Sequence, residues 1–332
     1  MCRRIFFKVL VLVLVIPLVS CGGGGIEFNY EGPTFIGPDP SSSTSQLPTD
    51  VVSIGPIARL ASFAVNGVTY DTRTAGITVN GETGVLSDLN TGYVVIVKGS
   101  LETAWTSGTA DQISFDANVI GPVESVDPVR RQLLVMGQRV RIDANTRFAP
   151  PFDLDALFSV STGTPLQVSG LSDANGDIIA THVRTVTNRQ DYQVIGAVSG
   201  IDYGKLTFRI NDLTVDYSSA LVINLPSGAP SNAMALIARG TLGTDGIFYV
   251  SELVNRVDTA DFVDDSHIAL TGYITRYKSD TDFSVDGLPV TTEFRTIFLN
   301  GLRRDLTLGA EVEIDGRWSG SGKVIAETIW FK

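Results

Sequence analysis

The sequence has 332 residues, of which 43% are hydrophobic and 18% charged, and its formal net charge is −11. Nucleic acids and anionic lipids bind to clustered lysine and arginine, and here the pairs Arg130–Arg131 and Arg303–Arg304 are isolated in the sequence. We therefore exclude nucleic acid as a partner. The length exceeds that of one small barrel and predicts more than one domain.

Residues 1–20 have the pattern of a secretory signal peptide. Arg3, Arg4 and Lys8 precede an apolar run from Val9 to Val19. That run is too short to cross a bilayer as a helix, which needs about 20 residues. A buried core strand or helix is the alternative, and the positive flank at the N-terminus favours the signal peptide.

The end of this run, "LVSC" at 18–21, resembles a bacterial lipobox. The resemblance implies cleavage before Cys21 and acylation of both its sulfur and the new amino terminus. Gly22 stands where an aspartate would retain the protein in the inner membrane, which implies the outer membrane. Stable anchoring takes at least two acyl chains, at about 0.8 kcal/mol per buried methylene. We therefore expect a membrane anchor at Cys21.

The mature chain is expected to have no free thiol and a flexible start. Cys2 leaves with the signal peptide and lipid occupies Cys21, so no cysteine remains for a disulfide, a metal or a nucleophile. Loss of the three basic residues of the leader takes the net charge from −11 to −14. The stretch 21–53 is rich in Gly, Ser, Thr and Pro without apolar periodicity, which predicts a flexible tether.

A tight hairpin recurs four times in the remaining chain. Its copies are "FAVNGVTY" (63–70), "LLVMGQRV" (133–140), "FRINDLTV" (208–215) and "FSVDGLPV" (283–290). Asn-Gly and Asp-Gly tolerate the positive φ angles of a type I′ turn, so Gly67, Gly137 and Gly287 are expected at hairpin tips. Each hairpin presents one apolar face, except that Gln138 falls opposite Val135 in the second copy.

Two further landmarks follow each hairpin. The first is an alternating strand that ends in Gly99, Gly170, Gly240 or Gly316, with polar Lys98, Ser169, Arg239 or Asp315 just before the glycine. Apolar and polar residues that alternate in this way indicate a half-buried antiparallel strand. The second is an apolar pair always three residues apart: Ala110 and Ile113, Ala180 and Val183, Val250 and Leu253, Ala326 and Ile329.

The constant spacing predicts four tandem β-domains at 54–119, 120–190, 191–263 and 264–332. Each supplies about five or six short strands, too few for two packed sheets, so we expect small OB-like β-barrels and an all-β fold. The pattern resembles the bacterial envelope family named domain of unknown function 5666 over about residues 54–332. The third copy departs from it by lacking the hairpin glycine and the first glycine of its strand. The resemblance implies the fold and leaves the activity open.

No catalytic, metal or cofactor site is predicted. His182 and His267 lie in different repeats, and we interpret them as ordinary strand or linker histidines. The stretch "SDANGD" (172–177) is too short for an EF-hand and is interpreted as a turn. The acidic stretch 257–265, which joins the third and fourth copies, is interpreted as a solvated linker, with a hinge stiffened by calcium as the alternative.

Trp105 and Trp318 occupy matching hairpin loops, and we expect them to pack against a neighbouring repeat, with stacking on sugar rings as the alternative. We expect a non-catalytic binding or scaffold lipoprotein of the outer membrane whose partner is an envelope protein or a glycan. Its ligand surface should be composite, formed where barrels meet. The alternatives are a carbohydrate-binding module and a hydrolase of envelope polymers that uses carboxylates such as Asp153 and Asp155.

Overall fold

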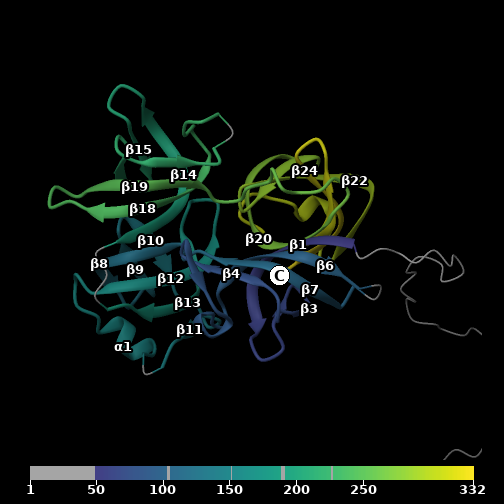
Figure 1. Ribbon diagram of the computed structural model, residues 1–332, viewed down its shortest axis with the longest axis horizontal. Coiled ribbons are helices and arrows are strands. Elements are labelled where there is room, and N and C mark those ends of the chain that lie inside the picture. Colours follow the sequence, from purple (N-terminus) through teal and green to yellow (C-terminus); the bar gives the residue numbers. More distant parts are fainter. Residues whose placement is uncertain (1–48, 103–104, 151, 188–190, 226) are drawn as a thin grey trace, which may run out of the picture. The chain divides into compact units, whose positions relative to one another are not determined.

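The computed structural model describes residues 49–332, apart from 103–104, 151, 188–190 and 226 (Figure 1). Cys21, the signal peptide and most of the predicted tether lie outside the described residues, so these expectations stay predictions. No helix in the part that is described is both long and apolar enough to cross a membrane. The predicted tether is too long at its end, because residues 49–53 already belong to the first strand.

The described chain is almost entirely β-structure. The first repeat contains β1 (Thr49–Arg59), β2 (Ala64–Val65), β3 (Val68–Asp71), β4 (Gly76–Val79), β5 (Glu82–Gly84), the short helix η1 (Leu86–Asp88), β6 (Val94–Leu101) and β7 (Ser107–Phe115). The second contains β8 (Val119–Asp127), β9 (Gln132–Val135), β10 (Gln138–Arg141), β11 (Arg147–Phe148), the helix α1 (Leu154–Phe158), β12 (Pro165–Ser172) and β13 (Ile178–Thr185).

The third and fourth repeats follow the same order. The third contains β14 (Tyr192–Asp202), β15 (Thr207–Ile210), β16 (Leu213–Asp216), β17 (Leu221–Ile223), β18 (Ala235–Leu242) and β19 (Ile247–Asn255). The fourth contains β20 (His267–Ser279), β21 (Asp282–Val285), β22 (Leu288–Leu299), η2 (Arg303–Asp305), β23 (Glu311–Ser319) and β24 (Lys323–Phe331). The all-β fold class is confirmed.

Within each repeat the strand pairings return to the strand where they began. In the first repeat the order is β1–β2–β3–β7–β6 and back to β1, with β3 and β7 parallel. The second repeat closes in the same order through β8, β9, β10, β13 and β12. The third and fourth repeats do likewise. The sheets are therefore small and barrel-like; the division into four independent OB-type domains stays a prediction.

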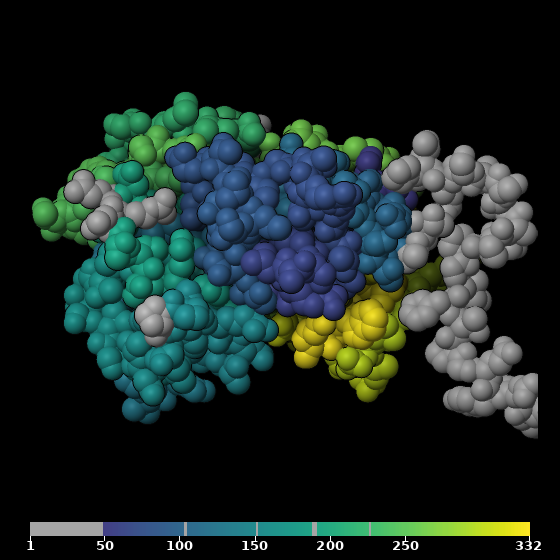
Figure 2. Space-filling view, turned by 60° about the horizontal axis from the view of Figure 1, so that its bottom comes forward, coloured from purple at the N-terminus to yellow at the C-terminus, as the bar shows by residue number. Residues whose placement is uncertain are grey.

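Pairing also continues from one repeat to another. Residues Val51–Ile54 of β1 pair in parallel with His267–Leu270 of β20, and the start of β8 pairs with β14. The first and fourth repeats thus share one 12-stranded sheet, and the second and third share another (Figure 1). In the space-filling view the purple and blue surface of the first repeat adjoins the yellow surface of the fourth (Figure 2). The hairpin partner β2 covers only the far half of β1, and β20 covers the edge that would otherwise be unpaired.

The predicted hairpins form as expected. Asn66 and Gly67 have φ angles of 48° and 77°, and the corresponding tips at Gly137 and Gly287 are also left-handed. Val65 lies opposite Val68, and Gln138 lies opposite Val135. Gln138 is fully buried, and its amide is satisfied there because it donates hydrogen bonds to the carbonyl oxygens of Met136 and Ile210 at 3.0 and 3.1 Å. Gln138, the polar residue on the otherwise apolar face of this hairpin, therefore links the second repeat to the third.

The two residues of the apolar pair, Ala110 and Ile113 in the first repeat, are three positions apart in every copy because each copy contains a β-bulge. Gly99 lies opposite Ala110 and Lys98 lies opposite Gln112, so Asp111 is the extra residue. The same register shift occurs at Gly170, Gly240 and Gly316. Ala110 and Ile113 both face the core as a result. A Cβ atom at Gly99 would overlap the carbonyl oxygen of Thr109, so the bulge requires glycine.

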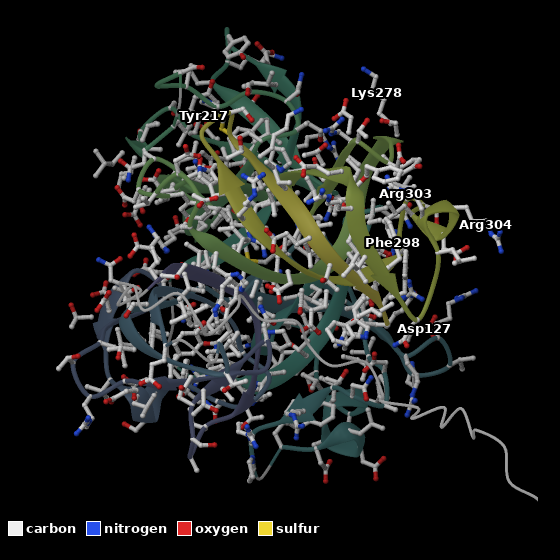
Figure 3. All side chains as sticks on the ribbon, turned by 90° about the vertical axis from the view of Figure 1, so that its right-hand side faces the viewer. Asp127, Tyr217, Lys278, Phe298, Arg303 and Arg304 are labelled. Atoms are coloured by element: carbon white, nitrogen blue, oxygen red, sulfur yellow. The ribbon has the colours of Figure 1, made fainter. Side chains whose placement is uncertain are left out.

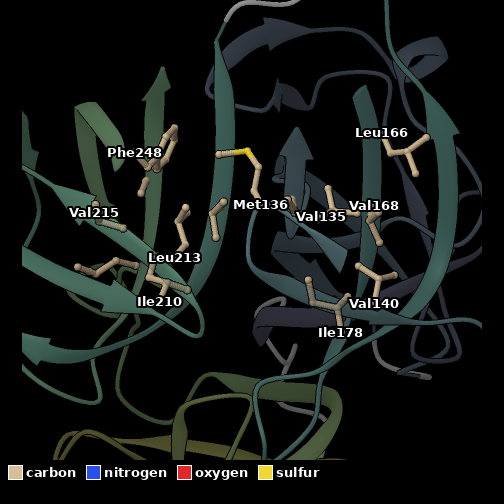
Figure 4. Packing of buried hydrophobic residues seen from close by; sticks show 14 of the residues in the cluster. Val135, Met136, Val140, Leu166, Val168, Ile178, Ile210, Leu213, Val215 and Phe248 are labelled. Carbon is tan, nitrogen blue, oxygen red and sulfur yellow. The ribbon is translucent and has the colours of Figure 1, made fainter. Parts of the chain in front are cut away.

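The buried hydrophobic residues form three clusters, and each cluster belongs mainly to one of the two sheets. One buried cluster belongs mainly to the first repeat, and a second joins the fourth repeat to Val52 and Ile54. The third cluster is shared by the second and third repeats (Figure 4). Met136, at the tip of a hairpin, is fully buried within it and packs over Gly121. Hairpin tips therefore serve as contacts between repeats.

Candidate functional site

A cleft of about 590 Å³ lies between the first repeat, the third repeat and the stretch 257–262. Its apolar floor includes Ile96 of β6 and Ile237 of β18. Charged side chains at its walls include Lys98 and Arg239, and the carboxylates of Asp116, Glu252 and Asp258 also line it. Two repeats and a connecting segment therefore build this cleft together.

The two repeats contribute the same outer face of their sheets. Lys98 and Arg239 each precede a bulge glycine, on β6 and β18 respectively, and Ile96 and Ile237 come two residues earlier. Across the bulge, Lys98 pairs with Gln112 and Arg239 pairs with Glu252. Alternation places all these side chains outside their barrels. The cleft is therefore where two equivalent sheet surfaces approach each other.

Arg239 joins the two walls. Its Nη2 lies 2.6 Å from Oδ1 of Asp116, and its Nη1 lies 2.5 Å from Oε2 of Glu252. Its Nε donates to Oε1 of Gln193 at 2.9 Å, so each of the three guanidinium nitrogens has a partner. The side chain of Arg239 is only 16% exposed. This geometry fixes the cation between two carboxylates from different repeats.

The charges in this network shift its pKa values. Burial raises the pKa of the Asp116 carboxyl, and the attraction of Arg239 offsets only part of that effect. Burial also lowers the pKa of Arg239, but the charges and hydrogen bonds of Asp116 and Glu252 more than reverse it, so the net direction is upward. The guanidinium is therefore a permanent cation in the wall.

The acidic stretch 257–265 is solvated only in part: Asp261, Asp264 and Asp265 are exposed, but the stretch is not a free linker. Phe262 is 8% exposed and packs edge-on against Trp318 of the fourth repeat, with ring centroids 5.0 Å apart. Nζ of Lys98 lies 3.4 Å from Asp261 and 5.7 Å from the centre of the Phe262 ring. Asp258 accepts a hydrogen bond from the amide of Asn224 at 2.8 Å. The stretch thus contacts three repeats and closes one side of the cleft.

A second buried ion pair lies at the joint between the third and fourth repeats. Nη2 of Arg256 is 2.6 Å from Oδ2 of Asp286 at the tip of the β21–β22 hairpin; the side chain of Asp286 is buried and that of Arg256 is 12% exposed. Burial raises the pKa of Asp286, and Arg256 offsets part of the increase. Arg256 also lines the cleft, so it belongs both to the wall of the cleft and to the joint between the third and fourth repeats.

The structure separates the two tryptophans proposed for stacking. Trp318 is 5% exposed and belongs to the core of the fourth repeat, so its ring is not accessible for the alternative of sugar stacking. It is buried because β23 alternates, which turns this position inward beside Phe262. Trp105 is 43% exposed and lies edge-on to His267 of the fourth repeat, 4.7 Å between centroids. It contacts a neighbouring repeat, which is the packing that the sequence favours.

The carboxylates considered for hydrolysis do not form a pair across a cleft. Asp153 is the N-cap of α1, where its Oδ1 accepts a hydrogen bond from the backbone N–H of Ala156 at 2.8 Å. Asp155 lies in the first turn of the same helix, where an acidic residue is favourable. Both positions are explained by the helix terminus.

Both histidines lie in strands. His182 of β13 is buried, its ring lies edge-on to Tyr93 at 4.8 Å, and burial, helped by Arg184 and Arg147, lowers its pKa to about 4. Nε2 of His267 lies 2.7 Å from Oδ1 of Asp315. Within residues 49–332, leaving aside the short gaps, no three His, Cys, Asp or Glu side chains are grouped to hold a metal ion.

Sequence reasoning missed the residues that build the cleft. Arg239 was visible as a polar residue before a bulge glycine, but Asp116 lies 123 positions away from it. A long cationic side chain at that outward position, matched by Lys98 in the first copy, was the one available signal. The partners became apparent only once the repeats were packed.

Comparison with known proteins gives a family without an assigned activity. The model of the family described as "Domain of unknown function (DUF5666)" matches residues 120–184 and 271–329. Among curated proteins none matches the chain. Among solved structures the chain is similar to "drosophila Unr CSD456", with 11% identity, coverage of 65% of this chain and 97% of that chain, and a TM-score of 0.16.

Proposed function

We propose that this chain, which the DUF5666 family model matches at residues 120–184 and 271–329, is a non-catalytic binding protein of the bacterial envelope. Acyl chains on Cys21 anchor it to the outer membrane, and the cleft between the first and third repeats binds its ligand. The observation that carries the proposal is the cleft of about 590 Å³, which lies within the range of ligand sites.

The chemistry of the cleft favours an extended ligand with both apolar and hydrogen-bonding groups. Ile96 and Ile237 offer an apolar floor, and Thr78, Gln112 and Asn255 add polar groups along the walls. The cations and carboxylates nearby are already paired with one another, so they contribute shape and fixed dipoles more than net charge. A glycan strand or an extended peptide segment of an envelope protein fits this description.

The test is site-specific photo-crosslinking in intact cells. A photoreactive amino acid at Gln112 lies in the cleft, whereas one at Thr328 occupies the same register in the fourth repeat, outside the lining of the cleft. We expect a crosslinked partner from position 112 and much less from position 328. Ser114→Trp, which fills the cleft, should lower the yield from position 112 by at least about tenfold. Equal yields from both positions, or from the blocked variant, would contradict the proposal.

One observation favours a second function, hydrolysis of an envelope glycan. Asp116 and Glu252 come from different repeats and line the same cleft, and the pKa of Asp116 is raised, as expected for a general acid. Against this, both carboxylates hold Arg239. Turnover of peptidoglycan or glycan fragments that is lost in Asp116→Asn would favour the enzyme, whereas retained binding without turnover would favour the binding protein.

A further inference from the structure

A second cleft, of about 580 Å³, lies between the second and fourth repeats and shares no lining residue with the first. Three arginines line it: Arg130 and Arg131 in the loop between β8 and β9, and Arg141 at the end of β10. The fourth repeat contributes Tyr273 and Leu308. The pair at 130–131 is isolated in the sequence, and the fold brings a third guanidinium beside it.

The carboxylates of this cleft are already engaged by backbone groups. Oδ1 of Asp143 accepts hydrogen bonds from the N–H groups of Asn145 and Thr146 at 2.8 and 3.0 Å. Oδ1 of Asp173 accepts from the N–H groups of Asn175 and Asp177 at 2.8 and 3.0 Å. These aspartates stabilise two loops, so their presence in the lining is explained without a ligand.

The guanidinium groups of Arg130 and Arg141 remain exposed although each has an acidic neighbour. Nη1 of Arg141 is 3.6 Å from Asp173, and its side chain is 50% exposed. Nη1 of Arg130 is 2.9 Å from Asp127, which Figure 3 labels, and its side chain is 76% exposed. Arg131 has a positive φ of 53° at the turn of the same loop. Guanidinium groups this exposed can still form two parallel hydrogen bonds with a carboxylate or phosphate.

The combination of three arginines is particular to the second copy. At the position of Arg141, one residue after the hairpin, the other copies have Asp71, Asp216 and Thr291. The turn at 130–131 is also basic in the third copy, where Lys205 pairs with Asp202 as Arg130 pairs with Asp127. The basic residues Arg131 and Arg141 have no basic counterpart in the other copies, so the repeat itself does not require them and they are available for a role of this cleft.

We propose that this second cleft binds an acidic glycan, whose anionic groups are held by Arg130, Arg131 and Arg141. The ring of Tyr273 and the side chain of Leu308 provide apolar surface for the C–H faces of the sugars. In a five-stranded barrel, the loops that flank this face are the ones that bind oligosaccharides and oligonucleotides. A glycan is favoured over a nucleic acid, since single strands need several stacking aromatics and the chain as a whole is acidic.

The experiment is calorimetric titration of the full-length chain with oligogalacturonate, which carries a carboxylate on each sugar. The matched neutral probe is a galactose oligomer of the same length. We expect binding of the acidic oligomer only, weakened by added salt. Arg131→Asn combined with Arg141→Gln should weaken that binding by at least tenfold. Arg141→Lys, which retains the charge and loses the planar fork, should weaken it by a smaller factor.

Arg73→Gln is the matched control, an exposed arginine beside the corresponding hairpin of the first repeat, and it should bind as the unchanged protein does. Thermal melting monitored by circular dichroism establishes that the variants are folded. Equal binding of the neutral oligomer, or unchanged affinity in the double variant, would overturn the proposal. If inorganic phosphate binds as tightly as the acidic oligomer, the site binds free anions and the glycan proposal is wrong. If a deoxythymidine oligomer binds more tightly than the acidic oligomer, the site is one for nucleic acid.

Discussion

Replacing Arg239 by methionine tests whether the shared cation holds the first and third repeats together. The change leaves Asp116 and Glu252 in a partly buried wall without their cation. Removing one partner of a buried ion pair costs about 3–5 kcal/mol, and we take the lower end because Glu252 is 33% exposed. We therefore expect a loss of about 3 kcal/mol in the free energy of unfolding at pH 7, or a melting temperature lower by roughly 6 °C.

The sign of the pH dependence gives a sharper test of the same variant. Burial already raises the pKa of Asp116, so its contribution to stability is present below its unfolded value of 3.8 and is lost as the pH rises through its folded value. Without Arg239 that pKa rises further. The cost of Arg239→Met should therefore be larger at pH 7 than at pH 4, where Asp116 becomes protonated.

The assay is urea denaturation of the full-length chain at both pH values, followed by circular dichroism and tryptophan fluorescence. Arg73→Met is the control, because the ion pair of Arg73 with Asp71 is exposed and its loss should change little. Adding Asp116→Leu to Arg239→Met should recover part of the stability, since it removes one of the two unpaired carboxylates. A cost for Arg239→Met no larger than that of the control, or one independent of pH, would refute the reasoning.

Three other outcomes are expected. Gly99→Ala should destabilise the first repeat by about 2 kcal/mol in urea denaturation, because its Cβ would overlap the opposite strand, whereas Gly76→Ala, whose Cβ would have an ordinary contact of 3.7 Å, should not. Phe262→Ala should cost about 3 kcal/mol by the same assay and lower crosslinking from the cleft, since the ring is buried against the fourth repeat. Cys21→Ser should leave an unprocessed or soluble species on membrane fractionation, and an unchanged outer-membrane distribution would contradict lipidation.

Local patterns predicted the hairpins and strands because those depend on neighbouring residues. The positive φ angles at Asn66 and Gly67 follow from the turn that two residues must make, and the register of Val65 with Val68 follows from that turn. The constant gap between Ala110 and Ile113 was visible in the sequence, but its cause, a bulge opposite Gly99, was not. A bulge is a property of two paired strands, and one strand read alone does not show it.

The candidate sites depended on contacts that no local pattern encodes. The sequence suggested matching loops for Trp105 and Trp318, but Trp105 lies in the β6–β7 loop and is 43% exposed, whereas Trp318 lies within β23 and is 5% exposed beside Phe262. Arg239 reaches Asp116 across 123 positions, and Arg141 joins the arginine pair at 130–131 only in the folded second repeat.

The sequence by itself determined that the described chain is made of β-hairpins with one apolar face and that this unit recurs four times. Both are consequences of residue spacing, which acts over a few positions. Tertiary structure alone decided that the first repeat pairs with the fourth and the second with the third. The reason is that half of β1 and the start of β8 have edges without a hairpin partner, and any strand of suitable twist can cover such an edge. Which strand does so is set by the packing of whole repeats, and that packing creates both clefts.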